Sequence, residues 1–178
     1  MPVTVNTFEL PDATQSVQTS LRQILDFINK HLPQQTEASK IGFRAKFIVT
    51  ELLTNALKHA GHTETSMRVT IDEKNITIKK MDYGKRFNPN NLASLLNRSP
   101  GFKVQLSSDV IHSIYAVVEK GCQVRFAYEE NLTNAPLDIS EIMEHFGMLI
   151  IIKAADEFTY QYDQSSGQNT FDVVLKLS

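Results

Sequence analysis

Five polar residues between positions 51 and 62 have the types and spacing that can hold a metal–phosphate ligand. At about 100° per residue, Glu51, Asn55, Lys58, His59 and His62 fall within about 100° of one another on a helix, so they share one face. Carboxylate and amide oxygens are ligands that Mg²⁺ prefers, and charged nitrogens bind phosphate. The same pattern is also typical of an amphipathic helix whose polar edge is simply solvated. Both interpretations stay open at this point.

Two long helices and an opening strand are predicted in the first third of the chain. Alternating apolar residues at Val3–Leu10 indicate a strand, and Asp12 or Thr14 can cap a helix that runs to about Leu32. The helix that carries the five polar residues is predicted at about Ser39–Ala60, with an apolar stripe on its inner side. That stripe comprises Ile41, Ala45, Ile48, Val49, Leu52 and Ala56.

Two hairpins are predicted, one after the long helix and one at the end of the sequence. The first joins strands at Ser66–Asp72 and Asn75–Met81, and we expect Lys79 and Lys80 to form a solvated strand end. The second turns at the Ser/Gly segment Gln164–Gln168 between two runs of alternating apolar residues. Long helices beside antiparallel strand pairs indicate an α+β fold, a two-layer α/β sandwich whose mixed, mostly antiparallel sheet is covered by helices on one face.

The middle of the sequence has weaker periodicity. It predicts a loop, a short helix near Leu92–Asn97, an amphipathic helix at about Ser108–Glu119 and a strand at Gln123–Tyr128. A last helix is predicted from about 138 to 155. The isoleucines in Met148–Ile152 would also suit a buried strand, but the helical spacing of neighbouring apolar residues favours the helix.

Composition limits the class of protein. With 178 residues, 42% hydrophobic and 21% charged, the chain has the balance of one soluble globular domain spanning 1–178. A single cysteine excludes an internal disulfide, and we find neither a signal peptide nor a run long enough to cross a bilayer, so a cytoplasmic location is expected. The net charge of −2 provides no general attraction for nucleic acid or an anionic membrane.

Two short stretches together resemble a known family. The string Glu51-Leu-Leu-Thr-Asn55-Ala-Leu-Lys58-His59-Ala60 resembles the first nucleotide-binding motif of the gyrase, chaperone and histidine-kinase (GHKL) ATPase superfamily. After the first hairpin, Asp82-Tyr-Gly84-Lys-Arg-Phe87 resembles the second motif, Asp-x-Gly-x-Gly-Phe. The order of predicted elements is most similar to the anti-sigma-factor type of serine protein kinase. The resemblance implies a Bergerat-type ATP-binding fold.

The second motif implies how the base is bound. In the family's arrangement Asp82 would accept a hydrogen bond from the adenine amino group, and Gly84 would let the backbone approach the base closely because it has no Cβ. Phe87 ends the motif and is assigned to the nucleotide site with it. From the residues alone, Asp82 could also be a turn residue that closes a strand.

The first motif implies how the phosphates are bound. Asn55 would hold Mg²⁺ through its side-chain oxygen, Lys58 or His59 would contact the phosphates, and Glu51 would act as general base. The third motif of the family has glycines opening the last long helix, where free N–H groups bind phosphate. Gly147 is the one candidate in this sequence.

The sequence departs from the family at two expected glycines. Arg86 replaces the glycine before Phe87, and His145 stands where a glycine of the third motif is expected. Each replacement leaves one fewer place where backbone can approach the ligand closely, which puts ATP affinity and turnover in question. In the resemblance, the segment at about 90–144 would correspond to the lid over the nucleotide, and we interpret it as an elaborated lid and a candidate partner surface. The alternative is that this segment only adds to the core.

These observations lead to two main hypotheses. The first is an ATP-binding serine/threonine protein kinase of the anti-sigma type, which uses Mg²⁺ and phosphorylates a regulatory partner protein, a sigma factor or anti-anti-sigma-like protein. The alternative is a non-catalytic protein-interaction module on the same fold, with weak or lost nucleotide binding. A third is the phosphate-donor domain of a split histidine kinase. No direct contact with nucleic acid or membrane is expected, and homodimerisation is left open.

Overall fold

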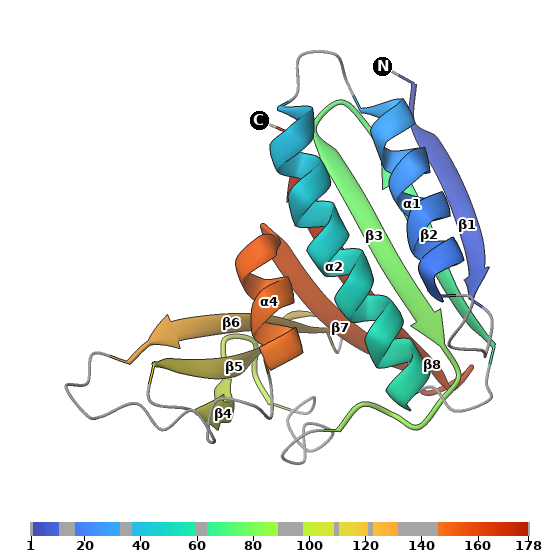
Figure 1. Ribbon diagram of the computed structural model, residues 1–178. Coiled ribbons are helices and arrows are strands. Elements are labelled where there is room, and N and C mark those ends of the chain that lie inside the picture. The colour runs from blue at the N-terminus through green and yellow to red at the C-terminus, as the bar shows by residue number, and fades with distance from the viewer. Residues whose placement is uncertain are drawn as a thin grey trace.

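An eight-stranded antiparallel sheet forms one layer of the molecule (Figure 1). The computed structural model describes residues 2–10, 17–32, 37–59, 64–88, 98–108, 111–120, 123–131 and 146–177. Across the sheet the strands follow the order β1-β2-β3-β8-β7-β6-β5-β4. In chain order they are β1 (Thr4–Leu10), β2 (Thr65–Ile71), β3 (Asn75–Asp82), β4 (Lys103–Ser108), β5 (His112–Val118), β6 (Gln123–Glu130), β7 (Glu157–Asp163) and β8 (Gln168–Lys176).

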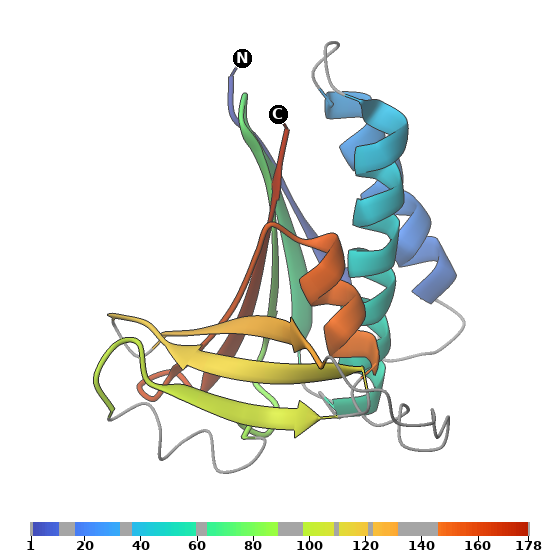
Figure 2. The ribbon, with the colours of Figure 1, turned by 90° about the vertical axis from the view of Figure 1, so that its left-hand side faces the viewer.

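Three described helices form the second layer, on one face of the sheet. These are α1 (Val17–His31), α2 (Ala38–His59) and α4 (Phe146–Ala154). Figure 2 shows them on the same side of the strands, with α2 between α1 and α4. The predicted α+β two-layer sandwich is thereby confirmed. Met148–Ile152 lies within α4, so the predicted helix is confirmed there, and its predicted start before residue 146 lies outside the described residues. The predicted caps of α1, Asp12 and Thr14, lie outside them as well.

Period-two burial in the strands explains why the helices cover only one face. In β3, Ile76, Ile78, Lys80 and Asp82 are buried on the helix side, and the residues between them are partly exposed on the other side. The predicted inner stripe of α2 is buried against this face together with Ile24 and Ile28 of α1. Removing this apolar surface from water is the main force that holds the two layers together.

Both predicted hairpins are present, and short polar side chains stabilise their turns. Asp72 Oδ1 accepts hydrogen bonds from the backbone N–H groups of Lys74 and Asn75, which closes the β2–β3 turn without an Asn-Gly pair. In the β7–β8 turn, Asp163 accepts hydrogen bonds from Ser165, and Gly167 adopts a positive φ of 74° that favours glycine.

The helix predicted at Ser108–Glu119 is wrong. Residues at this place end β4 and form β5, and β4 itself was not predicted. Ile114, Ala116 and Val118 are buried at every second position and pair with β6, so the period is that of a strand. The β-branched residues in this stretch favour the same outcome. The predicted strand after it is confirmed as β6.

The described part of the 90–144 segment extends the sheet. Its strands β4, β5 and β6 continue from β7, and in Figure 2 they run across the direction of β1–β3. The short helix predicted near Leu92–Asn97 lies outside the described residues, and the role of the segment as a lid stays a prediction. None of the described helices is long and apolar enough to cross a membrane.

Candidate functional site

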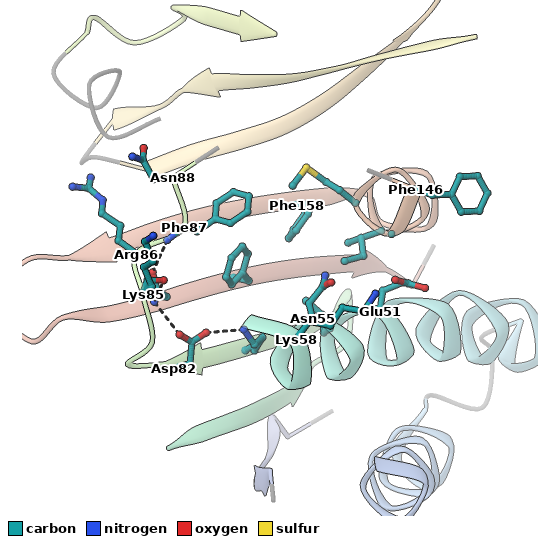
Figure 3. Close-up of a pocket in the computed structure, with 17 residues that line it drawn as sticks. Glu51, Asn55, Lys58, Asp82, Lys85, Arg86, Phe87, Asn88, Phe146 and Phe158 are labelled. Atoms are coloured by element: carbon teal, nitrogen blue, oxygen red, sulfur yellow. Dashed lines mark hydrogen bonds and ion pairs between the residues drawn. The ribbon is translucent and has the colours of Figure 1, made fainter. Parts of the chain in front are cut away.

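A cavity of about 560 Å³ lies between the C-terminal half of α2, the N-terminal end of α4 and the strands β3, β7 and β8 (Figure 3). The loop after β3 contributes to its wall as well. The polar part of the lining consists of Glu51, Asn55, Lys58, Lys80, Asp82, Lys85, Arg86, Asn88 and Asn169. Both sequence motifs therefore contribute to a single cavity.

The wall formed by α2 presents polar side chains that have no partner among the residues that the structure describes. Glu51, Asn55 and Lys58 are separated by four and three residues, which places them on one edge of the helix. Among the described residues, none of these three side chains has a hydrogen-bond or ion-pair partner. A carboxylate, an amide and an ammonium group are thus available to a ligand.

Asp82 lines the cavity where β3 ends. Its side chain is buried, with 4% of the residue exposed. Oδ2 accepts a hydrogen bond from Lys80 Nζ at 2.6 Å, and Oδ1 accepts hydrogen bonds from the backbone N–H of Gly84 at 3.0 Å and from Asn169 Nδ2 at 2.9 Å. These charge-assisted bonds compensate for burial of the carboxylate and fix its orientation.

Asn169 connects Asp82 to the loop that follows it. The two residues are paired across β3 and β8, and Asn169 is 1% exposed. Its Nδ2 also donates to the carbonyl of Gly84, while its Oδ1 accepts from the Tyr160 hydroxyl at 2.8 Å and from the Phe87 N–H at 3.3 Å. Burial raises the pKa of Tyr160 to about 12, so the phenol is the donor in this bond at neutral pH.

The sequence analysis missed Asn169 and misplaced Lys80. Lys79 and Lys80 were both expected to form a solvated strand end. Of the two, only Lys79 points away from the helices, and it forms an ion pair with Asp172 at 2.8 Å. Lys80 is 3% exposed and faces the cavity because successive side chains alternate across a strand. The period-two pattern shared by Ile76, Ile78 and Lys80 could have revealed this placement.

Gly147 lies in the first turn of α4, directly against Glu51. A Cβ at Gly147 would come within 2.5 Å of Glu51 Oε2, so this contact requires a glycine unless the carboxylate moves. Gly147 is thus brought to the predicted site, although its contact there is the carboxylate of Glu51. Its predicted interaction with phosphate stays a prediction.

The loop after β3 ends in an aromatic cluster. The Phe87 ring packs edge-on against Phe126, Tyr160 and Phe171, with ring centroids 5.3–6.0 Å apart. Arg86 lies over the ring of Tyr162, 4.7 Å from its centroid. Arg86, which replaces the expected glycine, is therefore stacked on an aromatic ring at the cavity wall. Phe87 packs the loop against the aromatic residues of the core.

Some predicted residues cannot be placed. His59 ends α2, but its side chain is not described, and His62 and His145 lie outside the described residues. Gly84 does not line the cavity itself, and its backbone N–H donates a hydrogen bond to Asp82 Oδ1. The functional roles predicted for all these residues stay predictions.

The electrostatic character of the cavity differs from that of the chain. Four basic side chains and two carboxylates line it, whereas the whole chain has a net charge of −2. The described residues contain no group of three or more His, Cys, Asp or Glu that could hold a metal ion. This donor set fits an anion that brings its own Mg²⁺, since Mg²⁺ is usually bound through one or two protein ligands and substrate phosphates.

Residues 14–175 match the model of the histidine kinase-like ATPase domain. The chain belongs to this family. The match covers nearly the whole sequence, including both motifs and all the elements around the cavity. A comparison with curated proteins finds no match.

Membership of the histidine kinase-like ATPase family agrees with the resemblance inferred from the two motifs at the level of the superfamily. It indicates an ATP-binding, regulatory role for this domain. In the structure the motif residues Asn55 and Asp82 both line one cavity, Asn55 from α2 and Asp82 from the end of β3.

Proposed function

We propose that this histidine kinase-like ATPase domain binds ATP with Mg²⁺ in the cavity and phosphorylates a serine or threonine of a regulatory partner protein. The partner class suggested by the resemblance is a sigma factor or an anti-anti-sigma-like protein, and the reaction is expected in the cytoplasm. One observation carries the proposal: Asn55 and Asp82 line the same cavity, and Glu51 beside Asn55 has no hydrogen-bond or ion-pair partner in the part of the chain that the structure describes.

The α2 wall supplies groups suited to the phosphate end. The Asn55 side-chain oxygen is available to Mg²⁺, and Lys58 can neutralise phosphate charge. When bound, Mg²⁺ would neutralise charge on the phosphates. The excess of basic side chains around the cavity favours a polyanion for the same reason.

Glu51 is the candidate base for the transfer. Its carboxylate lies on the cavity wall and, among the described residues, has no hydrogen-bond or ion-pair partner that would compete for a proton. Glu51 would accept the proton of the partner's hydroxyl as that oxygen bonds to the γ-phosphorus and ADP leaves. Positioning of the hydroxyl by such a carboxylate is the usual protein contribution to phosphoryl transfer.

A second candidate is a non-catalytic interaction module on the same fold. The observation in its favour is that the Asp82 carboxylate already accepts three hydrogen bonds from protein donors, while Arg86 stands where the family motif has glycine. The hydrogen bonds leave fewer free lone pairs on Asp82 for an adenine base, and the Arg86 side chain leaves less space for it. This candidate predicts weak nucleotide binding or none.

Calorimetric and thermal titrations with ATP separate the two candidates. A ligand that binds only the folded state stabilises it by about 2.7 kcal/mol at a concentration 100-fold above its Kd. We expect stabilisation by ATP that is larger with Mg²⁺ present, and loss of the Mg²⁺-dependent part in Asn55→Ala. Asp82→Asn should weaken binding about tenfold or more, because the base loses a charged acceptor.

Transfer itself is tested with γ-labelled ATP and co-purified partner proteins. Label should pass to a serine or threonine of the partner, and Glu51→Ala should abolish the transfer. Glu37→Ala is the matched control, since Glu37 is an exposed acid just before α2 that pairs with Lys40. Nucleotide binding without any transfer would favour the interaction module, and the absence of ATP binding would refute the proposed function.

A further inference from the structure

The Lys80 ammonium group has more donors than the described residues satisfy. Its only hydrogen-bond acceptor among the described residues is Asp82 Oδ2, at 2.6 Å, and its other close neighbour is the Phe171 ring, 5.0 Å away at the centroid. An ammonium group carries three N–H donors. Lys80 is nearly fully buried, so water does not readily replace the missing acceptors, yet its side chain lines the cavity.

Asp82 retains capacity for one more hydrogen bond at the same place. Its Oδ1 accepts from two donors, Gly84 and Asn169, whereas its Oδ2 accepts only from Lys80 within the described ranges of the chain. A carboxylate offers about four lone-pair positions in all. The cavity wall therefore presents a free acceptor position on Oδ2 and free N–H donors on Nζ, side by side.

A donor and an acceptor in adjacent positions match the edge of an adenine ring. On that edge the 6-amino group donates and the neighbouring ring nitrogen N1 accepts. A polar site built for both groups would reject a base that lacks either of them, because a buried protein group would then be left unpaired.

We propose that Lys80 is a specificity-determining residue that donates a hydrogen bond to ring nitrogen N1 of the adenine base, beside the amino group accepted by Asp82. The inference rests on the proposed function, since it requires ATP in this cavity. Lys80 would be a second side chain, after Asp82, that contacts the adenine base, and it carries a positive charge. The ion pair holds the donor and acceptor in position before the base arrives, which lowers the cost of ordering them on binding.

A purely electrostatic role for Lys80 makes a different prediction. If Lys80 only neutralised Asp82, the affinity would depend on the amino group of the base and would be insensitive to N1. The 1-deaza analogue of ATP distinguishes the two roles, because it keeps the amino group and has C–H in place of N1.

The experiment compares the Kd of ATP and of 1-deaza-ATP, each with Mg²⁺, for the full chain by calorimetry. We expect 1-deaza-ATP to bind about tenfold to a hundredfold more weakly, the range for a lost hydrogen bond to a charged group. Lys80→Met should bind the two nucleotides equally. Lys79→Met, on the opposite face of the same strand, should discriminate between them as the unmodified protein does.

The outcomes separate the two proposals. Binding of ATP and 1-deaza-ATP with Kd values within twofold of each other would overturn the role of Lys80 and leave the proposed function in place. Binding of neither nucleotide would overturn both. Should Lys80→Met fail to fold, as circular dichroism would show, the comparison in the unmodified protein still decides.

Discussion

The side-chain amide of Asn169 donates a 2.9 Å hydrogen bond to the carboxylate of Asp82, although the two residues are 87 positions apart in the chain. Both side chains are buried, and the strands that carry them pair directly at this point. The position of the predicted base-binding carboxylate therefore depends on a residue of the C-terminal hairpin.

Asn169→Ala is expected to lower the free energy of unfolding by about 3 kcal/mol. The substitution leaves the Tyr160 hydroxyl and the Phe87 N–H without their acceptor, and each unsatisfied buried group costs about 1–3 kcal/mol. Urea unfolding measures the change. Thr170→Ala is the control, because Thr170 lies on the other face of β8 and should change stability by no more than about 0.5 kcal/mol. Equal urea midpoints for the two variants would show that the network does not stabilise the fold.

Gly147→Ala should reduce turnover of ATP while leaving the fold intact. The added methyl group would displace the Glu51 carboxylate, whose closest oxygen is 2.5 Å from the Cβ position. A displacement of about 1 Å at a catalytic group can reduce the rate about a hundredfold, but the atom that moves is the end of a flexible side chain, so unfolding should change by less than about 1 kcal/mol.

Gly42→Ala provides the matched comparison for Gly147→Ala. Gly42 is also a helical glycine next to a polar side-chain end, with Asn29 Oδ1 3.3 Å from the Cβ position, but it lies outside the cavity lining. ADP release is measured for both variants with saturating Mg²⁺ and ATP in the presence of the co-purified partner protein. If the two glycine variants turn over ATP at the same rate, the Glu51 carboxylate has no catalytic role that depends on its position.

Tyr160 should make the protein less stable at alkaline pH. Burial raises the pKa of its phenol to about 12 in the folded state, above the ordinary value of 10.0. The folded state thus binds the phenol proton more tightly than the unfolded state does. The resulting contribution of Tyr160 to the free energy of unfolding is complete below pH 10 and is lost as the pH rises to 12. The loss amounts to about 2 kcal/mol. Urea unfolding measures both proteins across this pH range. Tyr160→Phe should be less stable than the unmodified protein at pH 10, and its free energy of unfolding should decrease less between pH 10 and pH 12. The same decrease in both proteins would contradict the raised pKa of Tyr160.

Asp156 should contribute to stability that is lost in acid. Burial alone would raise the pKa of Asp156, but hydrogen bonds from the Lys176 N–H and from Arg44 outweigh it, so the net pKa is below 3.8. The contribution is therefore present above pH 3.8 and decreases as the pH falls through the lowered folded pKa. Arg44 also donates to the carbonyl of Ala154, which links α2 to the end of α4.

Asp156→Asn tests this contribution. The variant should be less stable than the unmodified protein by about 1 kcal/mol at pH 7 and should lose less of its stability on acidification, as followed by thermal unfolding between pH 2 and pH 7. Glu157→Gln is the control, since Glu157 is an exposed neighbour whose ion pair with Lys176 is long, at 3.6 Å. Parallel pH profiles for Asp156→Asn and the unmodified protein would count against the expected role.

Local patterns were sufficient to predict most elements and the two motifs. The inner stripe of α2, the alternating strands of both hairpins and the placement of Glu51, Asn55 and Lys58 on one helical edge all follow from periodicity, which depends only on residues near each other in the chain. The prediction failed at β5, where Ile114, Ala116 and Val118 follow the period of a strand, and pairing with β6 buries this face.

Only the tertiary structure decided how the polar groups of the cavity are paired. Lys80 is buried because β3 turns that face toward α2, and Asn169 reaches Asp82 because β8 is inserted between β3 and β7. The contact of Gly147 with Glu51 likewise depends on how α4 packs on α2. Such contacts join residues distant in the chain, and their energy depends on burial and register, which short-range periodicity does not encode.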